Sequence, residues 1–195
     1  MNVLILGAYG QIARVATDLF LKQTDAVLTL YLRNARRLKL RSDRARVVEG
    51  DVLDLPKLKA AMAGQDVVYA NLAGNLDWQA RVIVEAMHTA GVKRLIFVSS
   101  MGIYGEVPGE HYHSALDPYR EAARVVEASD LDYTVLRPAW LNNRDEIDYG
   151  TTKKGEAFEN ADAVVSRKSV ADLVVKLATT SGLAIRESLG VHKAC

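Results

Sequence analysis

The chain opens with Met1-Asn2-Val3-Leu4-Ile5-Leu6-Gly7-Ala8-Tyr9-Gly10-Gln11-Ile12-Ala13, and this stretch decides the fold. The four consecutive apolar residues from Val3 to Leu6 predict a strand buried on both faces, as in a parallel sheet. Apolar residues then recur at helical spacing as far as Phe20, which predicts a helix. The two glycines therefore lie in the turn from a strand into a helix.

The small residues of this turn predict a phosphate site. Gly7 permits a tight turn, Gly10 lets the backbone approach a pyrophosphate, and Ala13 lets the helix pack closely on the strand. Free amides at the start of the helix would face the anion. The spacing is Gly-x-x-Gly-x-x-Ala, and an ordinary strand-to-helix turn is the alternative. A basic cluster after the second predicted strand favours the phosphate site, because a ribose would lie there.

Length, charge and cysteine content exclude several classes of protein. With 195 residues and 49% hydrophobic residues, the chain can bury one substantial core, so we expect a single domain over residues 1–195. A net charge of +1 gives no global field that would attract nucleic acid or an anionic membrane. The single cysteine, Cys195, excludes an internal disulfide framework and a cysteine metal site, which fits a reducing cytoplasm. The N-terminal apolar run is too short for a membrane helix.

After the opening stretch, strand and helix patterns alternate along the chain. Further strands are predicted at 26–32, 46–48, 66–70, 94–98 and 132–136. Helices are predicted at 55–63, at 76–90 with Asn75 as N-cap, at 118–129 with Asp117 as N-cap, and from a capping box at Ser169 to Asp172. This alternation predicts an α/β fold, a doubly wound parallel sheet with helices on both faces.

Two less regular segments, about 101–116 and 141–165, follow the fifth and sixth predicted strands. In a doubly wound sheet such segments lie over the carboxyl edge, where ligands bind, so we expect them on the substrate side. His111 and His113 lie in the first segment, and two histidines without a third ligand nearby are better explained as solvated side chains than as a metal site. No metal site is predicted.

Six motifs occur in order along the chain: Gly7-x-x-Gly10-x-x-Ala13, the strand ending in Arg33, Gly50-Asp51-Val52, Asn71-Leu72-Ala73-Gly74, Val98-Ser99-Ser100, and Leu131-Asp132-Tyr133-Thr134-Val135-Leu136-Arg137-Pro138. Together they resemble the atypical, extended-type short-chain dehydrogenase/reductase superfamily, which has a Rossmann-type fold. More closely, the chain is similar to its small NAD(P)H-binding branch, which includes NmrA-like regulators and biliverdin reductase B-like flavin reductases.

The resemblance implies a complete set of cofactor contacts along the chain. It assigns the pyrophosphate to Gly7, Tyr9, Gly10, Gln11 and Ile12. It assigns the adenine to Asp51 and Val52, the adenosine side to Leu72, Ala73 and Gly74, and the nicotinamide region to Pro138, Trp140 and Leu141.

Charge also indicates which dinucleotide would bind. An NAD site usually has an acidic residue near the end of the second strand, whereas the 2′-phosphate of NADP needs a cation. Arg33 occupies this position, and Arg36 and Arg37 follow closely. Guanidinium groups suit phosphate oxygens, so we expect NADP(H) rather than NAD(H). A solvated basic helix start is the alternative.

The catalytic residues depart from the family pattern. Short-chain dehydrogenases pair a tyrosine with a lysine four residues later, and the ammonium lowers the phenol pKa. Here Tyr119 is followed by Ala123, so the phenol should be a poor base. Tyr149 and Lys153 match the spacing in a segment that is a poor helix, and we interpret this match as a decoy. Ser100 lies where the family has its catalytic serine, although it could merely cap a turn.

Two functions remain open at this stage. The first is an NADPH-dependent oxidoreductase that reduces a flavin-, quinone- or carbonyl-like small molecule, with Ser100 and Tyr119 as candidate catalytic residues and an apolar pocket formed by Tyr104, Tyr112 and Trp140. The second is a non-catalytic NAD(P)H-sensing regulator of NmrA-like type, which would contact a protein partner.

Overall fold

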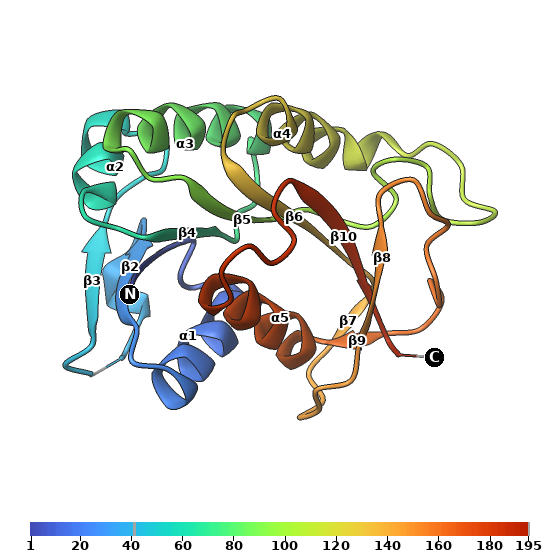
Figure 1. The fold of residues 1–195 in the computed structure, drawn as a ribbon, viewed down its shortest axis with the longest axis horizontal. Helices are drawn as coiled ribbons and strands as arrows, with labels where there is room; N and C mark the ends of the chain where they lie inside the picture. The colour runs from blue at the N-terminus through green and yellow to red at the C-terminus, as the bar shows by residue number, and fades with distance from the viewer. Residues whose placement is uncertain (41, 195) are drawn as a thin grey trace.

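The structure is a computed structural model of the chain, and it describes residues 1–40 and 42–194. A central sheet lies between two layers of helices (Figure 1). Its strands are β1 (Asn2–Leu6), β2 (Val27–Leu32), β3 (Ala45–Glu49), β4 (Val67–Ala70), β5 (Arg94–Val98), β6 (Asp132–Pro138), β8 (Gly150–Lys153) and β10 (Glu187–His192). The helices are α1 (Gln11–Gln23), α2 (Leu55–Met62), α3 (Leu76–Ala90), α4 (Asp117–Glu127) and α5 (Arg167–Thr179), with short 3₁₀ turns at Ala35–Arg37 and Ser114–Leu116.

The strand order is β3-β2-β1-β4-β5-β6-β10-β8, and every pair is parallel except β10 with β8. The chain runs outward from β1 to β3 on one side and then returns to place β4 on the other side of β1. The order of the strands reverses between β1 and β4, and ligands bind at such a switch point. The predicted Rossmann-type α/β fold is confirmed.

Two hydrophobic clusters form the core, one on each face of the sheet. One cluster lies under α1 and α5, and the other lies under α2, α3 and α4. Residues Val3 to Leu6 alternate between the two clusters and have no exposed surface. This burial on both faces explains the unbroken apolar run of β1.

Two helix starts differ from the predictions. Helix α5 begins at Arg167, and Ser166 is its N-cap because its side chain accepts a hydrogen bond from the Ser169 amide at 2.9 Å. The predicted capping box at Ser169 to Asp172 is therefore wrong by one turn. Asp117 is the first residue of α4 rather than its cap, and its carboxylate instead binds Arg120 and Tyr112. Asn75 does occupy the N-cap position of α3, without a side-chain capping bond.

The segment 141–165 is more regular than predicted. It contains β8, and its ends form a two-stranded parallel sheet of β7 (Leu141–Asn142) and β9 (Val165–Ser166). Strand β10 is also absent from the predicted elements. Position 190 of β10 is a glycine because the Phe158 ring packs against it. A Cβ at this position would lie 2.6 Å from that ring. These strands are short and partly polar, so pairing with distant segments, rather than local pattern, determines them.

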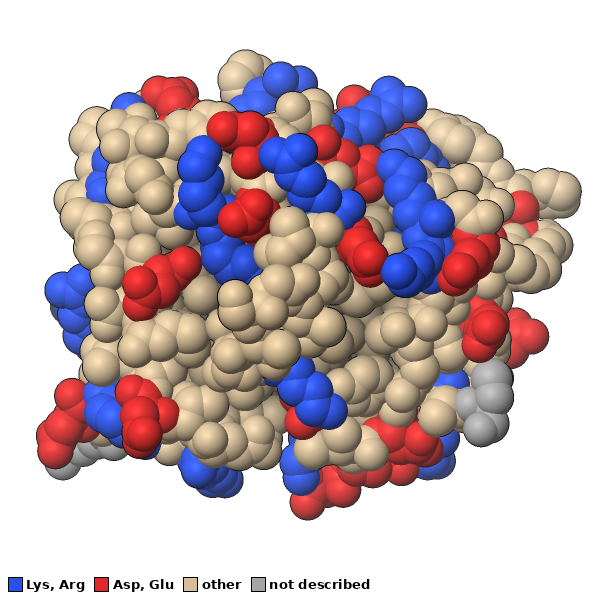
Figure 2. All heavy atoms as spheres, in the orientation of Figure 1, with Lys and Arg blue, Asp and Glu red and all other residues tan. Residues whose placement is uncertain are grey.

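The surface carries both signs of charge. Figure 2 shows Lys and Arg side chains interleaved with Asp and Glu on the face seen in Figure 1. Along residues 1–40 and 42–194, no helix combines the length and the apolar character needed to cross a membrane.

Candidate dinucleotide site

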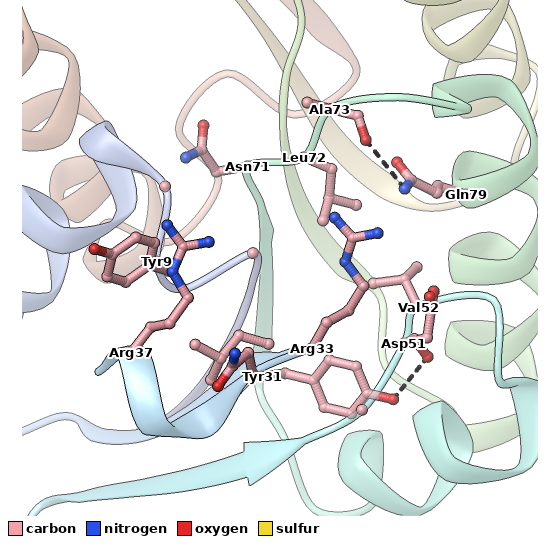
Figure 3. Close-up of a pocket in the computed structure, with 15 residues that line it drawn as sticks. Tyr9, Tyr31, Arg33, Arg37, Asp51, Val52, Asn71, Leu72, Ala73 and Gln79 are labelled. Carbon is pink, nitrogen blue, oxygen red and sulfur yellow. Dashed lines mark hydrogen bonds between the residues drawn. The ribbon is translucent and has the colours of Figure 1, made fainter. Parts of the chain in front are cut away.

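A cavity of about 350 Å³ opens at the carboxyl ends of β1, β2 and β4, at the switch point of the sheet. Figure 3 shows its walls, which come from the turn after β1, the segment after β2, the segment after β3 and the segment after β4. Its lining residues are Gly7, Tyr9, Gly10, Tyr31, Leu32, Arg33, Asn34, Arg37, Gly50, Asp51, Val52, Asn71, Leu72, Ala73 and Gln79.

Positions 7 and 10 of the first turn are occupied by glycine for different structural reasons. Gly7 has φ +74°, a conformation that side chains rarely adopt, and a Cβ there would lie 2.2 Å from the Asn71 carbonyl oxygen. Gly10 has φ −57° and ψ 151°, which any residue can adopt. A Cβ on Gly10 would, however, lie 2.2 Å from Nδ2 of the Asn71 side chain. The backbone thus requires glycine at position 7, whereas a side chain at position 10 would have to displace the end of the Asn71 side chain.

The start of α1 offers unpaired backbone donors beside this turn. The amides of Gly7 and Ala8 bind the Tyr31 carbonyl, and the Gly10 amide binds the Gly7 carbonyl. The first intrahelical bond runs from the Arg14 amide to the Gly10 carbonyl, so the amides of residues 11–13 have no partner inside the helix. The first turn contains no acidic residue and no side-chain cap. This end of α1 can therefore accept an anion.

Two guanidinium groups line the cavity after β2. Arg33 extends toward Leu72 and Val52, and Arg37 lies against the Tyr9 ring (Figure 3). The Arg37 guanidinium carbon is 4.2 Å from the centroid of Tyr9, and Arg14 lies on the same ring at 4.9 Å. Stacking holds Arg37 close to the first turn. The predicted Arg36, one residue earlier, is exposed and does not line the cavity.

The part of the cavity that contains Asp51 and Val52, predicted to contact the adenine, also contains Tyr31, which was not predicted from the sequence. Its hydroxyl donates a hydrogen bond to the Asp51 carbonyl at 2.9 Å. Burial raises the pKa of Tyr31 to about 12, with smaller contributions from Asp54 and Asp51, so the hydroxyl stays protonated. A Cβ on Gly50 would lie 2.2 Å from this hydroxyl, which explains the glycine before Asp51. The Asp51 carboxylate accepts from the Leu53 amide and lines the cavity.

Part of the predicted cofactor set lies outside this cavity. Gln11 is exposed at the start of α1, Ile12 is buried in the core, and Gly74 is exposed beyond Ala73. Pro138, Trp140 and Leu141 follow or end β6, three strands away from β1. Asn34, Asn71 and Gln79 line the cavity without having been assigned a role, although the Asn71-Leu72-Ala73-Gly74 motif indicated the region.

No hydrogen bond joins the two candidate catalytic residues, Ser100 and Tyr119, in the described structure. The Ser100 hydroxyl binds the adjacent Met101 carbonyl at 3.1 Å, and Ser99, not Ser100, reaches the Tyr119 carbonyl at 3.4 Å. Ala123 has no exposed surface and packs in the cluster under α3 and α4. The position four residues after Tyr119 therefore faces the core, and a lysine ammonium there would be buried.

Residues 7–181 match a protein family described as NAD(P)H-binding. The chain belongs to this NAD(P)H-binding family. Its solved relatives place it in an atypical short-chain dehydrogenase/reductase branch with a Rossmann fold.

Three relatives illustrate this membership. A Rossmann-fold NAD(P)-binding family protein from Shigella flexneri is 46% identical, with a TM-score of 0.85 over 98% of this chain and 93% of that one. A short-chain dehydrogenase/reductase from Veillonella parvula, solved in complex with NADP, is 32% identical with a TM-score of 0.89 over 98% and 94%. The Bacillus subtilis protein named uncharacterized sugar epimerase YhfK is 30% identical over 90% of this chain and 86% of its own.

The Tyr-x-x-x-Lys match at Tyr149 and Lys153 in this NAD(P)H-binding chain is not on a helix. Tyr149 precedes β8, whereas Lys153 ends β8 and pairs with Glu187 of β10 at 2.9 Å. The Tyr149 hydroxyl instead donates to Asp172 at 2.9 Å and accepts from Lys176 at 3.1 Å. Burial raises the pKa of Tyr149 above its usual value. The interpretation of this match as a decoy agrees with its geometry.

The aromatic pocket expected on the substrate side of this family member is only partly formed. Tyr104 and Tyr112 line a second cavity of about 510 Å³, beside Arg120 and Arg124 of α4. Trp140 is not among its lining residues, and its side chain is 65% exposed after β6. The three aromatic residues therefore do not form one pocket.

Proposed function

We propose that this protein is an NADPH-dependent oxidoreductase that reduces a flavin-, quinone- or carbonyl-like small molecule. The observation that carries the proposal is the pair of guanidinium groups, Arg33 and Arg37, at the end of β2. An NAD site would usually have an acidic residue there. The Veillonella relative crystallised with NADP supports the same preference.

The residues of the cavity fit a dinucleotide phosphate. The amides at the start of α1 would hold the pyrophosphate, and Arg33 and Arg37 would hold the 2′-phosphate through charge-assisted hydrogen bonds. Asp51 and Val52 would contact the adenine, and the segment after β6 would face the nicotinamide. When bound, NADPH supplies the hydride, and the protein supplies orientation and a shielded site.

The side chain at position 123 determines which acceptors we favour. A carbonyl reductase must protonate a developing alkoxide, and a general acid contributes about 10² to 10⁴ in rate. Ala123 offers no ammonium beside Tyr119, and its position has no exposed surface. A flavin or quinone delocalises the incoming charge and can take its proton from water. We therefore place these two classes before simple carbonyl compounds.

Tyr119→Phe is expected to lower kcat by less than about tenfold with a flavin or quinone, because Tyr119 has no cationic partner that would make it an effective proton relay. Steady-state oxidation of NADPH with each acceptor measures the effect. Ser100→Ala is the companion variant and should cost more if its hydroxyl orients the acceptor. A loss of about a thousandfold in Tyr119→Phe, or efficient oxidation of simple alcohols by the wild type, would contradict this mechanism.

The decisive experiment for the function itself is NADPH oxidation against a panel of flavins, quinones and carbonyl compounds. The activity named for the Bacillus relative, sugar epimerisation, consumes no NADPH overall, so it is tested separately by analysing the isomers formed from sugars incubated with the protein and cofactor. Turnover with a flavin or quinone supports the proposal. Tight NADPH binding without turnover of any acceptor would favour the alternative, an NAD(P)H-sensing regulator of NmrA-like type with a protein partner. The missing lysine is the observation that favours this alternative.

We also propose that the protein acts in the cytoplasm on a small-molecule partner, without binding nucleic acid or membrane. The single cysteine and the net charge of +1 support this. The interleaved charges seen in Figure 2 are consistent with it.

A further inference from the structure

A buried ion pair lies beneath the segments that would hold the nicotinamide and the acceptor. Arg137, in β6, has a side chain with no exposed surface, and its partner Glu106 has a side chain that is 5% exposed. Arg137 immediately precedes Pro138, and Glu106 lies six residues after Ser100. Neither residue lines the dinucleotide cavity or has a role in the mechanism proposed above.

The Glu106 carboxylate organises the turn that follows β5. It accepts hydrogen bonds from the Gly102 amide at 3.0 Å and from the Tyr104 amide at 2.8 Å, besides the Arg137 guanidinium. Gly102 has φ +86°, a conformation that glycine adopts readily, and the carboxylate binds the amides on both sides of Ile103 within this turn. The amide of Met101, next to Ser100, in turn binds the Pro138 carbonyl at 3.3 Å.

Arg137 and Glu106 also anchor the strands and loop on the far side. The Arg137 guanidinium donates to Ser188 Oγ of β10 at 3.1 Å and to the Thr152 carbonyl of β8 at 3.1 Å. The Glu106 carbonyl accepts from the Phe158 amide at 2.9 Å. One buried pair therefore joins the turn after Ser100, the end of β6, the two last strands of the sheet and the loop that contains Phe158.

We propose that Glu106 is a positioning residue which, through Arg137, holds Ser100 and the Pro138 to Leu141 segment in place for the nicotinamide half of the cofactor. This inference rests on the proposed use of NADPH. A buried charge whose partner is removed is strongly unfavourable, so loss of the carboxylate should displace both segments together. The adenine half, bound by β1, β2 and the segment after β3, should not be affected.

The test compares NADPH with 2′-phospho-ADP-ribose, which lacks the nicotinamide, by calorimetry on the wild type and on Glu106→Gln. Glutamine keeps the shape and an acceptor oxygen but removes the charge. We expect the fragment affinity to stay within about twofold and the NADPH affinity to fall about tenfold. The emission of bound dihydronicotinamide should also shift toward that of free NADPH.

Leu177→Ala is the matched control, because it removes a buried side chain from the distant end of α5 without touching the pair. It should lower stability while leaving the ratio of the two affinities unchanged. If Glu106→Gln does not fold, the double variant Glu106→Leu with Arg137→Met leaves no unpaired buried charge, which favours folding. It still removes the bonds from the Gly102 and Tyr104 amides to the carboxylate, so it should show the same selective loss of NADPH affinity.

The positioning role would be overturned if folded Glu106→Gln had the same ratio of NADPH affinity to fragment affinity as the wild type, whether both affinities fell equally or neither changed. A wild type that binds NADPH no more tightly than the fragment would overturn it as well, since no nicotinamide contact would then exist to be positioned. These readouts need no acceptor. A protein that turns over no acceptor would therefore refute the proposed reductase while leaving this inference testable and intact.

Discussion

Arg33→Ala is expected to weaken NADPH binding by about tenfold to more than a hundredfold while changing NADH binding little. A charge-assisted hydrogen bond contributes about 1.5 to 3 kcal/mol, which corresponds to this range of affinity. Arg33 lines the cavity and extends toward Leu72 and Val52, where the 2′-phosphate would bind, and NADH has no phosphate at this position (Figure 3). Titration calorimetry with both nucleotides measures the selectivity directly.

The neighbouring arginines provide the matched controls. Arg37→Ala should also weaken NADPH selectively, because Arg37 lines the cavity and is held on Tyr9. Arg36→Ala also removes one positive charge, but the Arg36 side chain lies outside the cavity. We therefore expect this variant to have a much smaller effect on NADPH affinity. If Arg36→Ala lost as much NADPH affinity as Arg33→Ala, the preference for NADPH over NADH would come from the general positive charge of this segment. If NADH bound the wild type more tightly than NADPH, the cofactor assignment would be wrong.

Gly10→Val is expected to abolish dinucleotide binding and leave the fold intact. The backbone of Gly10 is in a region that valine adopts, so folding does not require glycine there. The added side chain meets the end of the Asn71 side chain, which can move, and fills space needed by the pyrophosphate at the start of α1. Calorimetry with NADPH, together with a thermal melt, separates the two effects.

Asn71→Ala is the control for this variant. If Gly10→Val acted only by displacing the Asn71 amide, then Asn71→Ala would lose as much affinity. We expect Asn71→Ala to retain most of its binding, because it leaves the approach to the α1 amides open. Unchanged NADPH affinity in folded Gly10→Val would show that the first turn is not a pyrophosphate site. Gly7 is unsuitable for the same test, since its φ of +74° would strain any replacement.

The parallel core strands and the helices between them were predictable because each carries its own local signal. Val3 to Leu6 is apolar on both faces, and the helices following β1 and β4 show a 3.6-residue period. Helix starts were less certain, since Ser166 and Ser169 are equally suitable cap residues in the sequence. Only the bond from the Ser169 amide to Ser166 Oγ distinguishes them.

The candidate site was predictable in outline, from motifs at strand ends, but not in the choice between neighbouring side chains. Arg36 and Arg37 are adjacent residues of the same type, so the sequence does not show which of them lines the cavity. Arg37 does so because it stacks on the ring of Tyr9, which lies nearly thirty positions earlier in the chain. In the sequence, Tyr31 has no feature that distinguishes it from other strand residues. Only the structure shows that its hydroxyl donates a hydrogen bond to the Asp51 carbonyl. Ala123 showed that the lysine is missing, and only the structure shows that this position is buried.

The sequence by itself determined the alternation of strands and helices, the turn that begins at Gly7, and the basic segment after β2, because these depend on residues adjacent in the chain. Tertiary structure alone decided the strands from β7 to β10, the place of Arg37 in the cavity and the buried pair of Glu106 with Arg137. Each of these joins residues that are far apart in sequence. Their energy comes from burial and hydrogen bonds that exist only once the sheet has assembled, so no local pattern records them.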